Sequence, residues 1–364
     1  MDAGRTEVEA AAKAGAQIVD VLGAASDSTI EECVQAGKNY GARIVVDLIA
    51  VSDPVARARE VEDLGVDYIT VHAAIDDQMR GRDPFAVLKE VAQAVKLPVG
   101  VAGGVNSETA AQAVAAGASY VIVGGAITKA KDPEVATREI RRALDEGVEI
   151  PTTLFKRAGE AEIRQVLEMV SAANLSDALH RGGVLEGLRP LFPGLRMVGR
   201  ALTVRTYPGD WAKPVQAIDL AQPGDVIVID AGGVGPAIWG ELATYSALQK
   251  GLAGVVIDGA IRDSGDIIKL QFPAFSRLVL PNAGEPRGFG EIGVPIRIGH
   301  VRVEPGDWLL GDDDGVAVLP RRLAVEYANR AMDVLEKENR IREEIKEGRT
   351  LAQVTDLLRW EKKV

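Results

Sequence analysis

Residues 254–263 have the sequence Gly-Val-Val-Ile-Asp-Gly-Ala-Ile-Arg-Asp, an apolar run that ends in two charged residues. Such a continuous apolar run is typical of a strand that is covered on both faces in a parallel sheet. An earlier run, Val226-Ile227-Val228-Ile229-Asp230, precedes a glycine-rich loop and a helix that we expect to extend to Gly251. The order of strand, loop, helix and strand predicts an α/β fold that carries Arg262 and Asp263 at a strand end.

A second carboxylate lies one repeat upstream, at the start of the predicted helix. Glu241 follows Gly240 and is separated by twenty residues from Arg262 and Asp263. Arginine offers a planar fork for a carboxylate, and aspartate offers the hard oxygen that Mg²⁺ or Mn²⁺ prefers. The first N–H groups of the helix, at Leu242 and Ala243, form an anion site. The alternative interpretation is a surface Arg-Asp pair beside an unrelated helix-capping Glu.

The first 145 residues alternate helices with short apolar strands at a period of roughly 22 to 28 residues, which is typical of βα units. Each predicted helix ends at a glycine, such as Gly65 or Gly117. We therefore expect parallel strands with helical crossovers. The predicted strands are Ile18–Leu22, Arg43–Ile49, Tyr68–His72, Val99–Ala102 and Tyr120–Val123.

Two glycine pairs follow the last two of these strands. Gly103 and Gly104 come after one strand, and Gly124 and Gly125 after the next. Neighbouring glycine loops at strand ends can bind a phosphate through their N–H groups, although tight turning alone would also require glycine. His72 ends the third strand, where it could handle protons or simply be hydrogen-bonded.

Composition limits the classes of function. The net charge of −11 argues against a nucleic-acid partner, because phosphate backbones require a basic surface. The single cysteine excludes an internal disulfide and fits a reducing compartment. No apolar run is long enough to span a membrane, and the N-terminus lacks the apolar core of a signal peptide. We expect a cytoplasmic protein with small anionic substrates, no nucleic-acid partner and no membrane partner.

The rhythm changes after residue 145. Mixed charge with Pro and Gly predicts a linker over 146–162, then a second domain over 163–347 and a C-terminal tail or helix over 348–364. In the second domain we expect a helix from about Glu160 to Ala172, a capped helix start at Asn174–Leu179, and a charged helix over Arg321–Lys346. Pro-Gly-Asp turns between short strands indicate an α/β sandwich.

The first half resembles 3-hexulose-6-phosphate synthase, of the orotidine-monophosphate-decarboxylase-like barrel superfamily. The resemblance rests on Met1–Glu7, Val71–Gln78 and the two glycine loops. It implies a (β/α)8 barrel that joins formaldehyde to ribulose 5-phosphate, with a substrate-facing role for His72. In that family a strand ends in Asp-x-Lys-x-x-Asp, where the first Asp binds magnesium and the Lys handles the enediolate. Asp2 matches the final Asp and is a candidate catalytic residue.

The Asp and Lys of this motif have no counterpart upstream of Asp2 in the 364 residues. We expect an N-terminally incomplete barrel, because five strands cannot close an eight-stranded one, and an open edge strand at Ile18–Leu22. The chain either starts at an internal Met of a longer reading frame or is a remnant. Synthase activity is expected to be absent from these residues.

The second half resembles the RraA-like family over most of residues 165–345. The resemblance rests on Val198–Val204, Trp239-Gly240-Glu241, Ile257–Asp263 and Gly311–Val316. The family includes metal-dependent 4-hydroxy-4-methyl-2-oxoglutarate aldolases, which also decarboxylate oxaloacetate, and RraA proper, which inhibits a ribonuclease. The complete Glu241, Arg262 and Asp263 set favours catalysis.

The resemblance also implies roles for these residues. Asp263 anchors Mg²⁺ or Mn²⁺, Arg262 holds the keto acid and stabilises the enolate, and Glu241 orients water. The amides of Leu242 and Ala243 bind the substrate carboxylate, and the domain assembles as a homotrimer or hexamer. The whole chain is thus predicted to be a bifunctional-type lyase: an incomplete barrel followed by an RraA-like α/β sandwich. The alternative is an RraA-like regulatory module fused to a hexulose-phosphate synthase.

Overall fold

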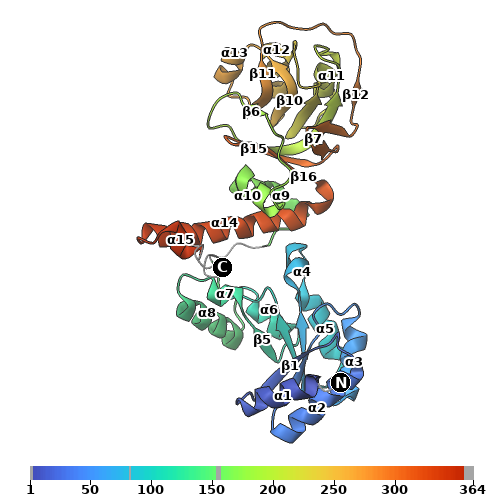
Figure 1. Ribbon diagram of the computed structural model, residues 1–364, viewed down its shortest axis with the longest axis vertical. Helices are drawn as coiled ribbons and strands as arrows, with labels where there is room; N and C mark the ends of the chain where they lie inside the picture. The colour runs from blue at the N-terminus through green and yellow to red at the C-terminus, as the bar shows by residue number, and fades with distance from the viewer. Residues whose placement is uncertain (1–2, 82, 153–156, 356–364) are drawn as a thin grey trace, which may run out of the picture. The chain divides into compact units, whose positions relative to one another are not determined.

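The computed structural model describes residues 3–81, 83–152 and 157–355. The chain divides into two compact units, the first extending to Arg157 and the second beginning at Ala158. Each unit has hydrophobic cores of its own. Figure 1 shows both units and labels many of their helices and strands.

The first unit contains a five-stranded parallel sheet in the order β1-β2-β3-β4-β5. Each strand is parallel to the next strand in the sequence, which is the arrangement that βα repeats produce and that the periodicity predicts. The strands are β1 (Ile18–Leu22), β2 (Arg43–Asp47), β3 (Tyr68–His72), β4 (Val99–Ala102) and β5 (Tyr120–Ile122).

Three of the helices in this unit begin at an Asp-Pro pair. The carboxylates of Asp53, Asp83 and Asp132 each accept a first-turn N–H, and a proline follows at the first helical position. Proline is tolerated there because its missing N–H would have no partner inside the helix. The helices are α1 (Ala3–Lys13), α2 (Asp27–Tyr40), α3 (Pro54–Asp63), α4 (Ile75–Met79), α5 (Pro84–Ala94), α6 (Ala110–Ala115), α7 (Gly125–Thr128) and α8 (Pro133–Glu146).

The two faces of this sheet differ. One face packs apolar side chains such as Ile44, Val46 and Ile69 against the helices. Because side chains alternate along a strand, the opposite face carries Asp20, Asp47, Thr70, His72 and Tyr120. The face of the sheet that carries these five residues, opposite the face that packs on the helices, is called the inner face.

The sheet does not close among the described residues. β1 and β5 are its two edges, and β1 pairs only with β2. Ile18 and Leu22 are 53% and 58% exposed on β1. The prediction of an open edge strand with exposed apolar side chains is therefore confirmed.

The second unit is built on a mixed sheet in the order β16-β15-β7-β8-β10-β11-β6, with β12 on β7 and β9 on β10. Its strands are β6 (Arg189–Pro190), β7 (Met197–Arg205), β8 (Asp225–Asp230), β9 (Ala237–Trp239), β10 (Gly254–Ile261), β11 (Ala274–Val279), β12 (Glu291–Ile292), β15 (Trp308–Asp312) and β16 (Gly315–Leu319). A separate hairpin consists of β13 (Ile296–Ile298) and β14 (Val301–Val303).

Helices cover this sheet in two groups. The first group, α11 to α13, buries residues such as Ile218, Ala247 and Ile267 against β8 and β10. The second group, α9, α10 and α14, packs against β15 and β16 (Figure 1). Their bounds are α9 (Ile163–Met169), α10 (Ala172–Ala178), α11 (Ala212–Leu220), α12 (Glu241–Lys250), α13 (Ser264–Lys269) and α14 (Ala324–Lys346), with α15 (Leu351–Val354) and 3-10 turns η1 (Glu160–Glu162) and η2 (Arg321–Leu323).

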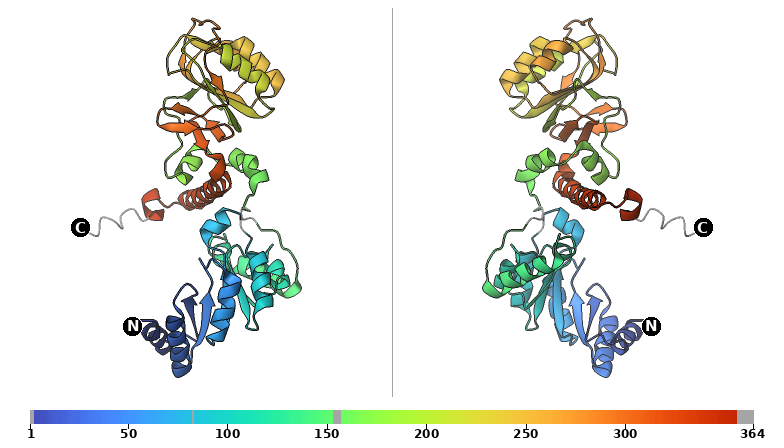
Figure 2. Two further views of the ribbon diagram at one scale, coloured as in Figure 1. Left: turned by 90° about the vertical axis from the view of Figure 1, so that its right-hand side faces the viewer. Right: turned by 90° about the vertical axis from the view of Figure 1, so that its left-hand side faces the viewer.

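The hairpin covers part of the other face of the sheet. Its residues Ile296, Ile298 and Val303 pack on Val228 and Phe275 in a separate core. Two side views of the sheet and its helices are given in Figure 2. The strands therefore have apolar side chains on both faces, as their continuous apolar sequences predict.

The helix expected over Glu160–Ala172 is present as η1 and α9 but ends at Met169, and the capped helix expected from Asn174 begins two residues earlier, at Ala172. The chain leaves α9 after Met169, and Ser171 caps a new helix, α10. The Ser171 hydroxyl accepts the Asn174 N–H at 3.0 Å, and the Asn174 side chain accepts the Ser171 N–H at 3.1 Å. This reciprocal capping box places Asn174 at the third helical position.

Within the described residues, no helix combines the length and the apolar character needed to cross a bilayer.

Candidate functional site

Two neighbouring strand ends bring the predicted lyase residues together. β9 and β10 are parallel, with Ala237 opposite Ala260 and Trp239 opposite Ile261. The Arg262 N–H donates to the Trp239 carbonyl at 3.0 Å. Gly240-Glu241 and Arg262-Asp263 therefore leave the sheet at the same edge, which is where sites of α/β sheets form.

The Asp263 carboxylate lies at the N-terminus of α12. Its Oδ2 atom accepts the Glu241 N–H at 3.1 Å and lies 3.5 Å from Arg262 Nε. Asp263 adopts a left-handed conformation with φ of 54°, which is uncommon outside glycine and often marks a functional position. Both side chains remain accessible, at 42% for Arg262 and 36% for Asp263.

Gly240 makes this arrangement possible. A Cβ atom at Gly240 would lie 2.5 Å from Asp263 Oδ2 and 3.1 Å from Arg262 Cγ. Its φ of −156° is open to any residue, so the requirement is for space and not for backbone conformation. The glycine lets the carboxylate and the guanidinium approach the helix terminus.

The start of α12 also presents the predicted anion-binding amides. Thr244 N–H donates to the Gly240 carbonyl at 3.1 Å and closes the first turn. The N–H groups of Leu242 and Ala243 precede this bond, so the helix supplies no carbonyl for them. The Leu242 side chain is 77% exposed, which leaves the terminus open to solvent.

The donor set around Asp263 fits a cation that keeps most of its water. No group of three or more His, Cys, Asp or Glu side chains within the described residues could hold a metal ion. Mg²⁺ commonly binds through one or two carboxylates plus water and substrate. The half-exposed Asp263 carboxylate suits that mode, whereas a dedicated cage of protein ligands is not present in the described part of the chain.

Sequence reasoning missed an ion pair that supports the same strands. Arg277 Nε lies 2.5 Å from Asp258 Oδ1, and the Asp258 side chain is only 10% exposed. Burial, together with the charge of Asp258, raises the pKa of Asp230 on the next strand. The available signal was an aspartate in the middle of an apolar strand, which must find a partner when it is buried.

In the first unit, the inner face brings His72 and Asp47 together. His72 Nδ1 lies 2.7 Å from Asp47 Oδ2, across the β2–β3 pair. The sequence left His72 either functional or simply hydrogen-bonded, and Asp47 lies within the predicted strand Arg43–Ile49. The structure shows that the two are partners of each other, at the carboxyl end of the sheet.

Two further groups on the inner face have altered acidity. Partial burial, with the nearby charge of Asp47, raises the pKa of Asp20 to about 6. Burial raises the pKa of Tyr120 to about 12, and its hydroxyl is bonded to Thr70 Oγ1 at 2.8 Å. The inner face therefore carries several titratable groups that influence one another.

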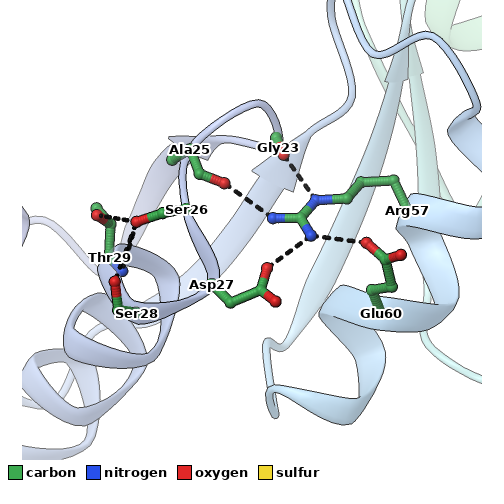
Figure 3. A network of polar contacts seen from close by, with 8 residues as sticks. All are labelled: Gly23, Ala25, Ser26, Asp27, Ser28, Thr29, Arg57 and Glu60. Atoms are coloured by element: carbon green, nitrogen blue, oxygen red, sulfur yellow. Dashed lines mark hydrogen bonds and ion pairs between the residues drawn. The ribbon is translucent and has the colours of Figure 1, made fainter.

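A partly buried arginine organises the loop after β1. Arg57 Nε donates to the Gly23 carbonyl at 2.8 Å, and its Nη2 donates to the Ala25 carbonyl at 2.9 Å (Figure 3). Its Nη1 lies 2.7 Å from carboxylate oxygens of both Asp27 and Glu60. The guanidinium thus holds the loop by all three nitrogens, a role that the sequence did not suggest.

The two glycine pairs lie at the same end of adjacent strands. Ala102 pairs with Ile122, so Gly103 and Gly124 leave the sheet side by side. Gly103 and Gly104 have φ of 88° and 76°, whereas a Cβ atom at Gly124 would meet no other atom within 4 Å. Tight turning accounts for the first pair only. Asp2 lies outside the described residues.

Comparisons with known proteins match the two units separately. Residues 1–140 match the family described as orotidine 5'-phosphate decarboxylase / HUMPS, and residues 172–318 match the family described as aldolase/RraA. The 3-hexulose-6-phosphate synthase 1 of Staphylococcus saprophyticus is 40% identical over 146 residues, which cover 40% of this chain and 70% of that protein.

The second unit is similar to an uncharacterized protein and to a protein described as an RNA-processing inhibitor. An uncharacterized protein of Methanocaldococcus jannaschii is 38% identical over 195 residues, covering 53% of this chain and 93% of that protein. A solved structure described as the RNA-processing inhibitor RraA from Thermus thermophilis is 31% identical, covers 41% of this chain and 92% of that chain, and has a TM-score of 0.39.

The folds and the charged strand ends define an α/β protein whose candidate sites lie at the carboxyl ends of parallel strands. With these matches, the chain belongs to the orotidine 5'-phosphate decarboxylase / HUMPS family through its first unit and to the aldolase/RraA family through its second. The predicted fusion of two such domains is confirmed.

Proposed function

We propose that the second unit is a divalent-metal-dependent lyase that cleaves 4-hydroxy-2-oxo acids and decarboxylates oxaloacetate. One observation carries the proposal: Arg262, the Asp263 carboxylate and the N-terminus of α12 converge at one sheet edge. A guanidinium, a cation-binding carboxylate and free amides together suit a 2-oxo acid, which carries a carboxylate beside a ketone.

The residues divide the chemistry between them. The amides of Leu242 and Ala243 bind the substrate carboxylate, and Arg262 lies where negative charge develops on the ketone oxygen. As the carbon–carbon bond breaks, its electron pair moves into an enolate. The other fragment leaves as CO2 from oxaloacetate, or as a carbonyl compound after water has taken the proton of the 4-hydroxyl group. A proton from water oriented by Glu241 then completes pyruvate. Mg²⁺ or Mn²⁺ held through Asp263 would supply further positive charge to the enolate oxygen. Such stabilisation contributes several kcal/mol.

Replacement of Arg262 tests the assignment. We expect Arg262→Ala to lower the kcat for pyruvate release from oxaloacetate by about 10²- to 10³-fold, the usual cost of removing one charge-stabilising donor. Turnover is measured with Mn²⁺ or Mg²⁺ by coupling pyruvate to lactate dehydrogenase. The matched control is Arg302→Ala. Arg302 lies on β14, is exposed and pairs with Glu304.

Two results would count against a lyase. Equal turnover by Arg262→Ala and the wild type would remove Arg262 from the site. No metal-dependent turnover of any 2-oxo acid would favour the regulatory alternative, in which this unit acts by binding another protein, as the name of the Thermus relative describes. Sedimentation equilibrium would test the accompanying proposal of a homotrimer or hexamer.

For the first unit, the pairing of His72 with Asp47 supports a second proposal. We propose that its inner face, with the loops at Gly103 and Gly124, binds a sugar phosphate, as the synthase relatives suggest. Calorimetric titration with ribulose 5-phosphate measures this binding, and a lack of saturable binding would contradict the proposal.

A further inference from the structure

A cavity in the second unit lies between two loops that the proposed lyase site does not use. It has a volume of about 650 Å³ and is lined by Tyr207, Pro236, Glu285, Arg287 and Phe289, among others. This volume lies within the usual range for small-molecule sites. None of Gly240, Glu241, Arg262 and Asp263 lines it.

A buried carboxylate holds the two loops together. Asp210 is 3% exposed and accepts N–H groups of Ala212, Arg287 and Phe289 at 3.1, 3.1 and 2.8 Å. Although burial acts to raise it, the pKa of Asp210 is lowered by these backbone donors. Trp211 Nε1 adds a bond to the Gly284 carbonyl at 3.1 Å.

Close backbone contact makes the walls rigid. A Cβ atom at Gly284 would lie 1.9 Å from the Gly209 carbonyl oxygen, and one at Gly209 would lie 2.7 Å from Pro236 Cγ. No side chain fits at either position, because the backbone of Gly209 lies against Gly284 and the ring of Pro236 lies against Gly209. These close contacts, together with the bonds of Asp210, hold the loops that line the cavity.

Two aromatic rings project from this rigid frame into solvent. Tyr207 and Phe289 are 63% and 56% exposed, and their ring centroids are 5.7 Å apart at an interplanar angle of 70°. An edge-to-face pair leaves ring faces available for a third ring. Large exposed apolar side chains that are held in place at a cavity are typical of a binding site.

Arg287, which lies beside the two rings, indicates the charge of the ligand. The Arg287 guanidinium is 68% exposed and contacts Glu285 at 3.4 Å. An exposed, long ion pair of this kind contributes little to stability, so Arg287 can exchange Glu285 for another carboxylate. Its fork then suits a planar carboxylate bound beside the rings.

We infer that this cavity binds a small aromatic carboxylate, at a site separate from the 2-oxo acid site. The ring stacks on Phe289 and Tyr207, and the carboxylate pairs with Arg287. The inference does not depend on lyase activity, because it rests on residues that the proposed chemistry does not involve.

Calorimetric titration of the full chain tests the inference, with benzoate as the probe. We expect saturable binding that weakens at least about tenfold in Phe289→Ala and in Arg287→Gln, because each removes one half of the recognition. Cyclohexanecarboxylate, which has the charge without the aromatic ring, and benzyl alcohol, which has the ring without the charge, should bind at least about tenfold more weakly than benzoate. Tyr40→Ala and Arg302→Gln are the matched controls, since both residues are exposed and lie outside the cavity.

Near-UV circular dichroism verifies that the variants keep the native fold, and the backbone bond from Arg287 to Asp210 does not involve the substituted side chain. No saturable binding of benzoate would overturn the inference, as would equal affinities for benzoate and cyclohexanecarboxylate. Wild-type affinity in folded Phe289→Ala would also overturn it. Loss of oxaloacetate turnover in Phe289→Ala would place the cavity inside the lyase site and refute the separate site.

Discussion

At Gly240 the available space, and not charge, decides whether the proposed lyase site can form. We expect Gly240→Ala to lower oxaloacetate turnover about 100-fold, because the added methyl would displace Asp263 Oδ2 and a misplacement of about 1 Å can cost that much. The native fold should persist, since alanine readily adopts the extended φ of this position. Steady-state kinetics and the melting temperature measure the two effects.

Gly265→Ala provides the control for this substitution. Gly265 lies in α13, two residues beyond Asp263, and no atom lies within 4 Å of a Cβ there. Its turnover should match the wild type. If Gly240→Ala were as active as Gly265→Ala, the close approach of the carboxylate to the helix would have no part in catalysis.

At the residue scale, some of the candidate site residues were predictable from the sequence and others were not. Arg262, Asp263 and Glu241 were proposed from their spacing together with the resemblance to the RraA-like family, and the structure brings Arg262 and Asp263 to the start of α12. The contacts of Asp258 with Arg277, of Asp210 with Phe289 and of Arg57 with Gly23 were not predicted, because these partners are 19, 79 and 34 residues apart in the sequence. Long-range pairing is decided by tertiary packing and has no local sequence signal.

At the scale of elements, β1 is an exposed edge strand with apolar side chains. Such an edge presents unpaired N–H and carbonyl groups and favours association with other chains. We expect Leu22→Lys to reduce concentration-dependent association several-fold, because a charge on the edge opposes strand pairing. The stability should change by no more than about 0.5 kcal/mol, since Leu22 is already 58% exposed.

Sedimentation velocity over a range of concentrations measures this association. Val114→Lys on α6 is the control, because Val114 is also exposed, at 47%, but lies on a helix. Equal reduction by both variants would attribute the effect to net charge and not to the strand edge.

Elements were predictable where local signals were strong. The apolar runs of the first unit formed the five parallel strands that they indicate. The second unit was less predictable near Ser171, because a helical apolar pattern continues through the break. The structure locates the break, because the side chains of Ser171 and Asn174 form a capping box that begins a new helix.

At the scale of the whole molecule, the two units have separate cores, so we expect them to unfold in separate steps. All four tryptophans, at 211, 239, 308 and 360, lie after residue 157. Tryptophan fluorescence should therefore follow one transition in urea, whereas far-UV circular dichroism should show two. A single transition that coincides in both measurements would contradict independent units.

The sequence by itself determined the α/β class, the division into two parts and the residue types of the proposed 2-oxo acid site. These follow from apolar periodicity and from motif spacing, which are local properties of the chain. Only the tertiary structure decided that Asp263 meets the start of α12, that His72 pairs with Asp47, and that two distant loops enclose the aromatic cavity. The physical reason is that these contacts depend on strand register and on backbone close approach, which arise when separate segments pack together.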